Sequence, residues 1–182
     1  MNKIDTSKWK EFSIGELFKT ELKNNKLQVP TGASIKKKNL IDGNVPRITV
    51  TGINNGIYGN FDCNIKTNDY RIYENFISVS FLGTIFYHPY KASLDMKVHC
   101  LKPKNITLNK YTGLFFVTAI KASLRDSSYA DQLSSTVLPE MNIKLPISST
   151  GEPDYIFMEN FMRDIESVSN TSLSSILSFL HR

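Results

Sequence analysis

Three consecutive lysines, Lys36, Lys37 and Lys38, form a dense group of positive charge in the sequence. Adjacent ammonium groups suit the phosphates of a nucleic acid, which bind point charges whatever the base sequence. Residues 23–110 contain 13 Lys and Arg against 5 Asp and Glu, whereas residues 111–182 contain 5 against 8. A basic block followed by an acidic segment is expected when one region contacts a polyanion. A solvated basic face is the alternative interpretation of the charge alone.

A second group of polar residues contains side chains that can recognise bases. Arg47 precedes a β-branched run that ends at Thr51, and Asn54 and Asn55 follow shortly afterwards. Arginine can donate two hydrogen bonds to guanine, and asparagine can pair with adenine through its amide. The run Asn54-Asn55-Gly56 is also typical of a plain turn, because these residues tolerate positive φ angles. We predict that Arg47, Asn54 and Asn55 lie near base edges and that Thr51 is a further DNA contact, with a simple turn as the alternative for the asparagines.

The sequence matches no common catalytic motif. It contains no glycine-rich phosphate loop, no Gly-x-Ser-x-Gly and no His-Glu-x-x-His. The histidines, His88, His99 and His181, do not have the spacing of a metal pair with Cys63 or Cys100. The sequence therefore predicts a binding protein rather than an enzyme, and no metal site.

One pair of residues has a spacing that is also found in nuclease active sites. Asp95 and Lys97 have the acid-x-lysine spacing of Mg²⁺-dependent nucleases, in which the acid binds the metal and the lysine steadies the attacking water. Such a site needs a second acid upstream, and Asp69 or Glu74 would have to supply it. Because acid-x-lysine triplets are common by chance, we interpret this one as coincidental.

The composition is that of an ordinary globular protein, with 41% hydrophobic and 21% charged residues in a chain of 182. A chain of this size can bury a core without covalent cross-links. Two cysteines are too few for a disulfide framework, which favours a reducing compartment. No apolar run approaches the roughly 20 residues of a membrane span, and the N-terminus lacks the apolar core of a signal peptide. We therefore expect a cytoplasmic protein without membrane contact.

Short β-branched and aromatic runs between residues 32 and 117 predict a body made mostly of strands. We expect turns with positive φ angles at residues 54–56 and at Gly59-Asn60. The predicted strands cover residues 47–51, 72–76, 77–81, 84–87 and 98–101, with a short edge strand within 137–146.

Four segments are predicted to be helical. Ser13, with Glu16 three residues later, indicates a capping box that opens a short helix. Residues 111–124 fit a helix packed on the sheet, although part of this segment also suits a strand, and residues 123–136 are expected to form a loop. A helix should start near Asp154, and a second helical piece, 173–180, should follow a break at residues 170–171. Together the patterns predict an α/β (α+β) fold with a mostly β body.

Four segments, in order, resemble the target recognition domains of bacterial restriction–modification specificity subunits. The opening of such a domain resembles residues 9–18, WKEFSIGELF, and a central segment resembles residues 46–59, PRITVTGINNGIYG. Its middle resembles residues 83–87, GTIFY, followed by Asp95 and Leu101. The tail of single-domain subunits and of type IIB/IIG recognition modules resembles residues 143–161, IKLPISSTGEPDYIFMENF. The resemblance covers nearly the whole chain.

The resemblance implies a sequence-specific DNA-binding subunit that directs a partner adenine methyltransferase, and a nuclease, to a target site on double-stranded DNA. It implies no catalysis and no cofactor in this chain, with S-adenosylmethionine and Mg²⁺ bound by the modification and restriction subunits. It also implies a recognition domain, which we assign to residues 1–150, and a helical spacer, which we assign to residues 151–182. A β-rich interaction module without DNA, or a carbohydrate-binding module, is the alternative.

Three further residues are predicted DNA contacts. By the same resemblance, Arg125 and Tyr129 lie in a polar loop that precedes the last strand of such domains, and an ordinary surface loop is the alternative. Lys91 belongs to the basic block and completes the predicted set.

The resemblance also bears on assembly, because similar full-length subunits contain two recognition domains and this sequence contains one. We predict a half-subunit that pairs with a second copy and recognises a split palindrome. The predicted contact residues form an apolar stripe at helical spacing: Phe157, Phe161, Ile165, Leu173 and Leu177. Packing of this stripe on the chain's own body is the alternative.

Overall fold

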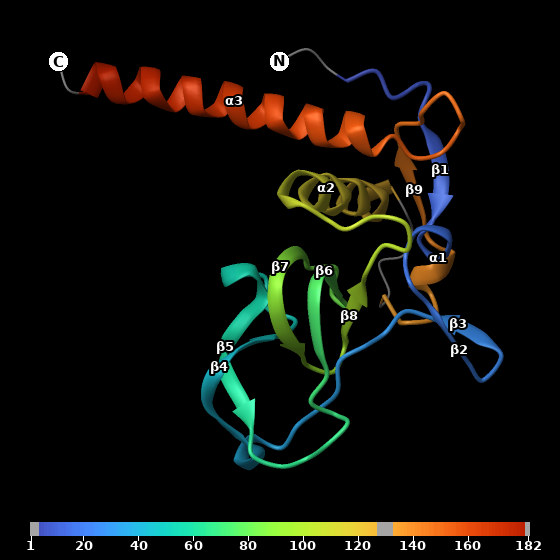
Figure 1. Cartoon of the computed structure of the whole chain (residues 1–182), viewed down its shortest axis with the longest axis vertical. Helices are drawn as coiled ribbons and strands as arrows, with labels where there is room; N and C mark the ends of the chain where they lie inside the picture. The colour runs from blue at the N-terminus through green and yellow to red at the C-terminus, as the bar shows by residue number, and fades with distance from the viewer. Residues whose placement is uncertain (1–3, 127–132, 181–182) are drawn as a thin grey trace.

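A computed structural model describes residues 4–126 and 133–180 of the chain (Figure 1). A curled β-sheet forms one end of the molecule, one helix lies above it, and a long helix crosses the other end and projects beyond the body. No helix in the described ranges is long and apolar enough to cross a membrane.

The main sheet has five strands in the order β5-β4-β7-β6-β8. All pairs are antiparallel except β4 with β7, which are parallel. The sheet curls so that residues from four of its strands share one cluster, made of Ile48, Phe76, Ala92, Leu94, Val98 and Cys100. The strands are β4 (Leu40–Ile48), β5 (Ile57–Cys63), β6 (Ile72–Ser80), β7 (Ile85–Leu94) and β8 (Val98–Leu101).

Three strand predictions need correction. Residues 49–51 lie outside the strand predicted over 47–51, because β4 ends at Ile48. Residues 72–80 form one strand rather than two, because Asn75 adopts a φ of 51° at a bulge and the strand continues beyond it. Gly59 and Asn60 lie inside β5 rather than in a turn, since they pair with Arg47 and Pro46 of β4. Pairing with a neighbouring strand therefore overrides the local preference of Gly and Asn for turns.

Helix α2 (Lys110–Asp126) covers the other face of the sheet (Figure 1). Phe116 and Ile120, four residues apart, are buried in the larger core cluster together with Ile77, Val79 and Ile85 of the sheet. The helix that runs through the whole segment confirms the predicted helix and excludes the strand alternative. Residues 123–126 belong to α2 rather than to the predicted loop.

Several short elements complete the body. The predicted capping box is present at α1 (Ile14–Leu17): Ser13 Oγ accepts from Glu16 N at 3.1 Å, and Glu16 Oε2 accepts from Ser13 N at 2.8 Å. Strand β1 (Lys10–Ser13) pairs with β9 (Asn142–Leu145), which confirms the short strand expected near the end of the body. The remaining elements are the hairpin β2 (Glu21–Lys23) with β3 (Lys26–Gln28) and the 3₁₀ turns η1 (Lys37–Asn39), η2 (Asn54–Gly56) and η3 (Leu138–Glu140).

Helix α3 (Tyr155–Leu180) is continuous, so the predicted break at residues 170–171 is wrong. Its polar residues are accommodated within the helix, as when Thr171 Oγ1 donates to the Ser167 carbonyl at 3.0 Å. Asp154 caps the start, because its Oδ1 accepts from Phe157 N at 2.9 Å. Met158 is fully buried in the same core cluster as α2. The first turns of α3 therefore share the core of the body.

Candidate functional site

A tight loop at the end of β4 presents the two predicted asparagines to solvent. Asn54, Asn55 and Gly56 have φ angles of 47°, 51° and 78°, which confirms the expected turn conformation. Two backbone bonds close the loop, from Thr49 N to Gly56 O at 2.8 Å and from Gly56 N to Ile53 O at 2.9 Å. Asn54 and Asn55 are both exposed. We call residues 49–56 the asparagine loop.

The asparagine loop lies against the turn between β6 and β7, residues 81–84. Thr84 Oγ1 donates to the Val50 carbonyl at 3.4 Å. The 81–84 turn itself lies beside α2. A Cβ atom added to Gly83 would be only 3.6 Å from Leu124 Cδ1 of that helix. The asparagine loop, the 81–84 turn and the last turns of α2, residues 121–125, therefore form one surface, which we call the loop face.

The loop face is cationic. Lys121 Nζ lies 5.6 Å from the centre of the Phe86 ring on β7, and Lys97 Nζ lies 4.5 Å from the Phe81 ring. Arg125 is exposed one helical turn after Lys121. Phe86 also lies against the asparagine loop, because a Cβ on Gly56 would be 3.4 Å from Phe86 Cδ2, so the structure places Lys121 near that loop and Arg125 one turn further along the helix. Neither Lys97 nor Lys121 was predicted as a DNA contact, although the four-residue spacing of Lys121 and Arg125 places both on one helix face.

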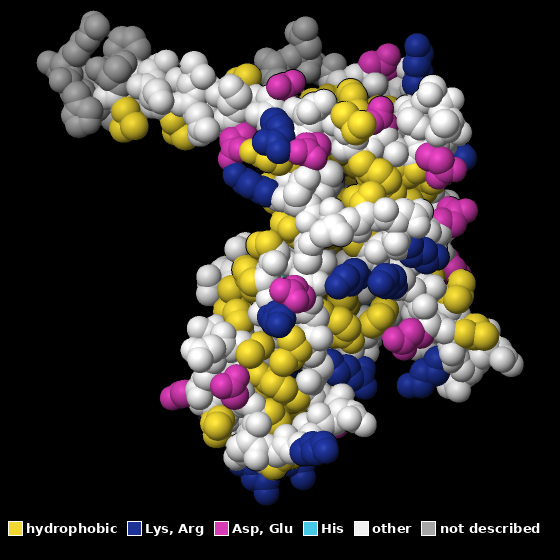
Figure 2. Space-filling view, viewed as in Figure 1, with side chains coloured by type: hydrophobic (Ala, Val, Ile, Leu, Met, Phe, Trp, Pro, Cys, Tyr) yellow, Lys and Arg dark blue, Asp and Glu magenta, His cyan; other side chains and the backbone are white. Residues whose placement is uncertain are grey.

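The three lysines are not part of the loop face. Lys36, Lys37 and Lys38 are exposed at and around η1, which precedes the start of β4. Leu40 pairs with Cys63 at that end of β5, whereas Ile48 pairs with Ile57 at the other end. Six residues of strand span about 20 Å, so the lysines and the asparagine loop lie at opposite ends of β5. Lys and Arg side chains also gather at the lower end of the molecule, below β4 and β5 (Figure 2).

Arg47 lies inside the protein, which corrects its predicted place beside a base. Its side chain is 3% exposed, and Nη2 donates to Asp95 Oδ1 at 2.6 Å and to the Ala33 carbonyl at 2.9 Å. Nη1 is buried without a hydrogen-bond partner among the described residues. In this position the guanidinium joins β4 to the segment after β7 and does not reach a base edge.

The nuclease-like pair is also accounted for by the fold. Asp95 is bound to Arg47, and the Lys97 ammonium lies over the Phe81 ring. Within residues 4–126 and 133–180, no group of three or more His, Cys, Asp or Glu side chains is placed to hold a metal ion. Each member of the pair thus has a structural contact that explains its position.

The other predicted contact residues are spread over the surface. Thr51 is half-buried in the asparagine loop, and its Oγ1 accepts from Ile53 N at 3.5 Å. Lys91 is exposed on β7, with Nζ 4.0 Å from Glu74 Oε2. Tyr129 lies outside the described residues. The loop face therefore contains Thr51, Asn54, Asn55 and Arg125, whereas Lys91 and the three lysines lie elsewhere.

A chain of hydrogen-bond contacts links side chains of β6 and β7 around the buried His88. His88 Nε2 lies 2.8 Å from Ser78 Oγ, and His88 Nδ1 lies 3.3 Å from the Tyr90 hydroxyl. Burial without a charged partner lowers the pKa of His88 to about 4. The histidine is fully buried, so this Ser–His pair is a packing feature rather than an exposed nucleophile.

The apolar stripe of α3 has two different environments. Phe161 is half-buried against the core cluster and Ile165 is half-buried, whereas Leu173 and Leu177 are 58% and 55% exposed. Phe157 is 38% exposed and stacks on Phe161, with ring centres 5.9 Å apart. The projecting half of α3 shows apolar side chains on its surface in Figure 2. Packing on the body therefore accounts for the first half of the stripe, whereas Leu173 and Leu177 in the second half are more than half exposed.

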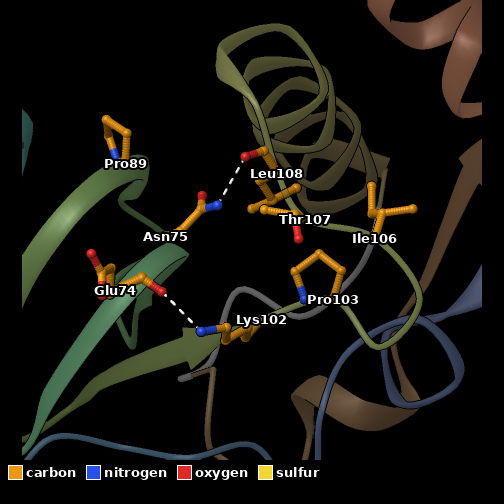
Figure 3. Close-up of a pocket in the computed structure, with 8 residues that line it drawn as sticks. All are labelled: Glu74, Asn75, Pro89, Lys102, Pro103, Ile106, Thr107 and Leu108. Carbon is orange, nitrogen blue, oxygen red and sulfur yellow. Dashed lines mark hydrogen bonds between the residues drawn. The ribbon is translucent and has the colours of Figure 1, made fainter.

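Two hollows open on the described surface, and the larger one borders the loop face at Ala122 and Ser123. One, of about 690 Å³, lies where β1, α2 and α3 meet and is lined in part by Trp9, Phe115 and Phe161. The other, of about 330 Å³, lies beside the bulge of β6 (Figure 3). There the Asn75 amide donates to the Leu108 carbonyl at 2.9 Å, and Lys102 Nζ donates to the Glu74 carbonyl at 3.1 Å. In the second hollow these polar groups therefore hold the chain to itself.

Comparison with known proteins identifies the class to which this fold and surface belong. Residues 6–175 match the family of type I restriction modification DNA specificity domains. The chain belongs to that family.

A particular relative and three solved structures agree with the assignment. The chain is 32% identical over 161 residues to the specificity subunit S.BcgI of the type II restriction enzyme BgcI from Heyndrickxia coagulans, covering 87% of this chain and 43% of the relative. The fold is similar to the HsdS subunit from Thermoanaerobacter tengcongensis (TM-score 0.59, 12% identity, 95% of this chain and 40% of that one). It is also similar to the type I S subunit from M. genitalium (TM-score 0.54, 19% identity, 95% of this chain and 44% of that one).

A third similar structure describes complex assembly and conformational transition of the type I R-M system (TM-score 0.59, 11% identity, 96% of this chain and 43% of that one). The chain thus spans less than half the length of each of these relatives. It corresponds in extent to a single portion of a longer specificity subunit.

Proposed function

We propose that this chain binds double-stranded DNA through the loop face and recognises a short base sequence as the specificity component of a restriction–modification system. The observation that carries the proposal is the asparagine loop: two exposed amides on a backbone-bonded loop, beside cations, in a chain of the DNA specificity domain family. Asparagine pairs with adenine through two hydrogen bonds, and nearby cations neutralise phosphates. The family assignment disfavours the carbohydrate-binding alternative.

In this proposal Lys36, Lys37 and Lys38 bind phosphates rather than bases. Their distance of about 20 Å from the asparagine loop corresponds to roughly six base pairs along a duplex. Neutralising all three to glutamine should lower the slope of log K against log salt by about 0.9 for each phosphate that the variant no longer neutralises. A triple variant of the exposed Lys8, Lys23 and Lys26 is the matched control. Equal slopes for the two triple variants would reject the assignment.

We propose that catalysis belongs to partner subunits. The chain would direct an adenine methyltransferase, and a nuclease, to the recognised site in the cytoplasm, with S-adenosylmethionine and Mg²⁺ bound by those partners. Sequencing of methylated adenines in cells with and without this gene tests the proposal. It predicts that one sequence motif loses methylation when the gene is removed, and unchanged methylation would contradict it.

We also propose that the projecting half of α3 pairs with a second copy of the chain. Leu173 and Leu177 are more than half exposed, with Ile176 between them at 56%, and pairing would remove this apolar surface from water. A symmetric pair would recognise two inverted half-sites separated by unspecified bases. Light scattering should give a dimer that Leu177→Asp converts to a monomer, whereas the exposed Asn170→Asp should leave it intact. A monomeric wild type, or an asymmetric motif, would contradict the proposal.

A further inference from the structure

Two exposed aliphatic side chains on the loop face have no part in the proposed contacts. Ile53, in the asparagine loop, is 76% exposed, and Leu82, in the 81–84 turn, is 64% exposed. Their loops touch, because Thr84 Oγ1 donates to the Val50 carbonyl. Single exposed aliphatic residues are ordinary on protein surfaces. Two on adjoining loops, both within a polar and cationic surface, suggest a shared ligand.

The neighbours of the two side chains indicate what that ligand is. Asn54 and Asn55 follow Ile53 directly, and the cations Lys121 and Arg125 belong to the adjoining end of α2. Cations complement phosphates and amides complement base edges, so the charge on this surface favours a nucleic acid over a lipid or an apolar protein helix. On the major-groove edge of DNA, the apolar group that an aliphatic side chain can contact is the C5-methyl of thymine.

We propose that Ile53 and Leu82 contact thymine methyl groups in the major groove and make the chain specific for A·T pairs beside the bases that Asn54 and Asn55 recognise. The inference rests on the proposed function and deepens it. Asparagine recognises adenine, and adenine carries thymine on the opposite strand, so an aliphatic neighbour suits the same A·T-rich stretch.

The loop geometry favours such a contact. The backbone bond from Gly56 N to the Ile53 carbonyl holds Ile53 within the closed asparagine loop, and its β-branched side chain has few rotamers. Ile53 therefore gives up little conformational freedom when it meets a methyl group. Burying one methyl group changes an equilibrium constant by about fourfold, which sets the size of the expected effect.

The test uses duplexes selected from a random pool by the full chain. Each thymine of the selected site is replaced in turn by deoxyuridine, which removes the methyl group and leaves the base pairing unchanged. The affinity of the wild type should fall by about fourfold at two or more positions. Ile53→Ser, which leaves no methyl group, should abolish this effect at one of these positions, and Leu82→Asn should abolish it at another.

Matched controls exist elsewhere on the surface. Ile156, at the start of α3, is 75% exposed, and Leu22, on β2, is 72% exposed. Ile156→Ser and Leu22→Asn should keep the full sensitivity to deoxyuridine. Because all four substitutions are at exposed positions, each variant should fold.

Three outcomes overturn the inference in different ways. A selected site without thymine, or one indifferent to every deoxyuridine, rejects the methyl contact and leaves the proposed function standing. Variants whose affinity falls equally on thymine and deoxyuridine duplexes indicate an apolar wedge between bases instead, and also reject it. Failure to select any sequence rejects the proposed function and the inference together.

Discussion

Arg47 and the asparagine loop are close neighbours in sequence, yet one lies inside the sheet and the other in solvent. Arg47 faces inward on β4 and is held by Asp95, whereas Asn54 and Asn55 stand on a loop after the strand ends. The buried Arg47 cation needs a fixed partner and serves the fold, whereas the two amides are exposed and Asn54 Nδ2 makes only a long bond, 3.4 Å, to the Ile57 carbonyl. Residue type thus suggests a contact, and position decides whether that contact is internal.

From this difference, we expect Arg47 to affect stability far more than recognition. Arg47→Met leaves the Asp95 carboxylate unpaired, at 35% side-chain exposure, so the free energy of unfolding should fall by about 3 kcal/mol. Urea unfolding of the wild type and the variant measures the difference. Arg125→Met, at an exposed position, is the control and should change stability by less than about 0.5 kcal/mol. A stable Arg47→Met protein that has lost only sequence preference would reverse the two roles.

The second prediction concerns His88, which is fully buried. His88 contacts Ser78 and Tyr90, so it stays neutral in the folded protein, with a pKa of about 4. The unfolded chain binds a proton at His88 below about pH 6.5. Stability is therefore complete above about pH 6.5 and should fall by up to about 3 kcal/mol as the pH drops towards 4.

Unfolding measured across this pH range in the wild type and in His88→Asn gives the test. The variant should show a shallower dependence on pH. His99 retains part of it, because burial also lowers the pKa of that residue. Identical pH profiles for the two proteins would show that His88 is not kept neutral by burial.

The third prediction concerns the exposed Asn55 in the asparagine loop. Asn55→Gly keeps a residue that tolerates the φ of 51° and removes the amide. Affinity for the recognised site should fall by about 1–3 kcal/mol, with little change on random duplex. Asn25→Gly, at an exposed position with a φ of 57° between β2 and β3, is the control and should leave binding unchanged. Equal decreases in affinity for both duplexes would indicate that Asn55 contacts the DNA backbone rather than a base.

The smallest effect is expected at Lys91. Its Nζ lies 4.0 Å from Glu74 Oε2 in an exposed pair, so Lys91→Gln should change the free energy of unfolding by less than about 0.5 kcal/mol. If Lys91 contacts a phosphate, the salt slope should fall by about 0.9 equally for every DNA sequence. A large decrease in stability would show that an exposed cation here has the structural role that we assign to Arg47.

The sequence by itself determined the elements whose cause is local. The capping box at Ser13 and Glu16, the helix over residues 111–124 and the positive-φ turn at Asn54 and Asn55 all follow from residues a few positions apart. These elements can be predicted from sequence because hydrogen bonds and side-chain spacing within one element determine them. The order of four family-like segments also led to the DNA specificity domain family, which the match over residues 6–175 confirms.

The tertiary structure alone decided which polar residues are exposed. Arg47 is buried because β4 lies parallel to β7, which brings Arg47 beside Ser93 and within reach of Asp95. The loop face exists because α2 packs on the sheet and places Lys121 beside Phe86. Strand partners and helix packing join residues that are far apart in the chain, and no local pattern encodes those contacts. Burial is a property of the assembled sheet and helix, so the division between fold and recognition surface emerges only when they pack.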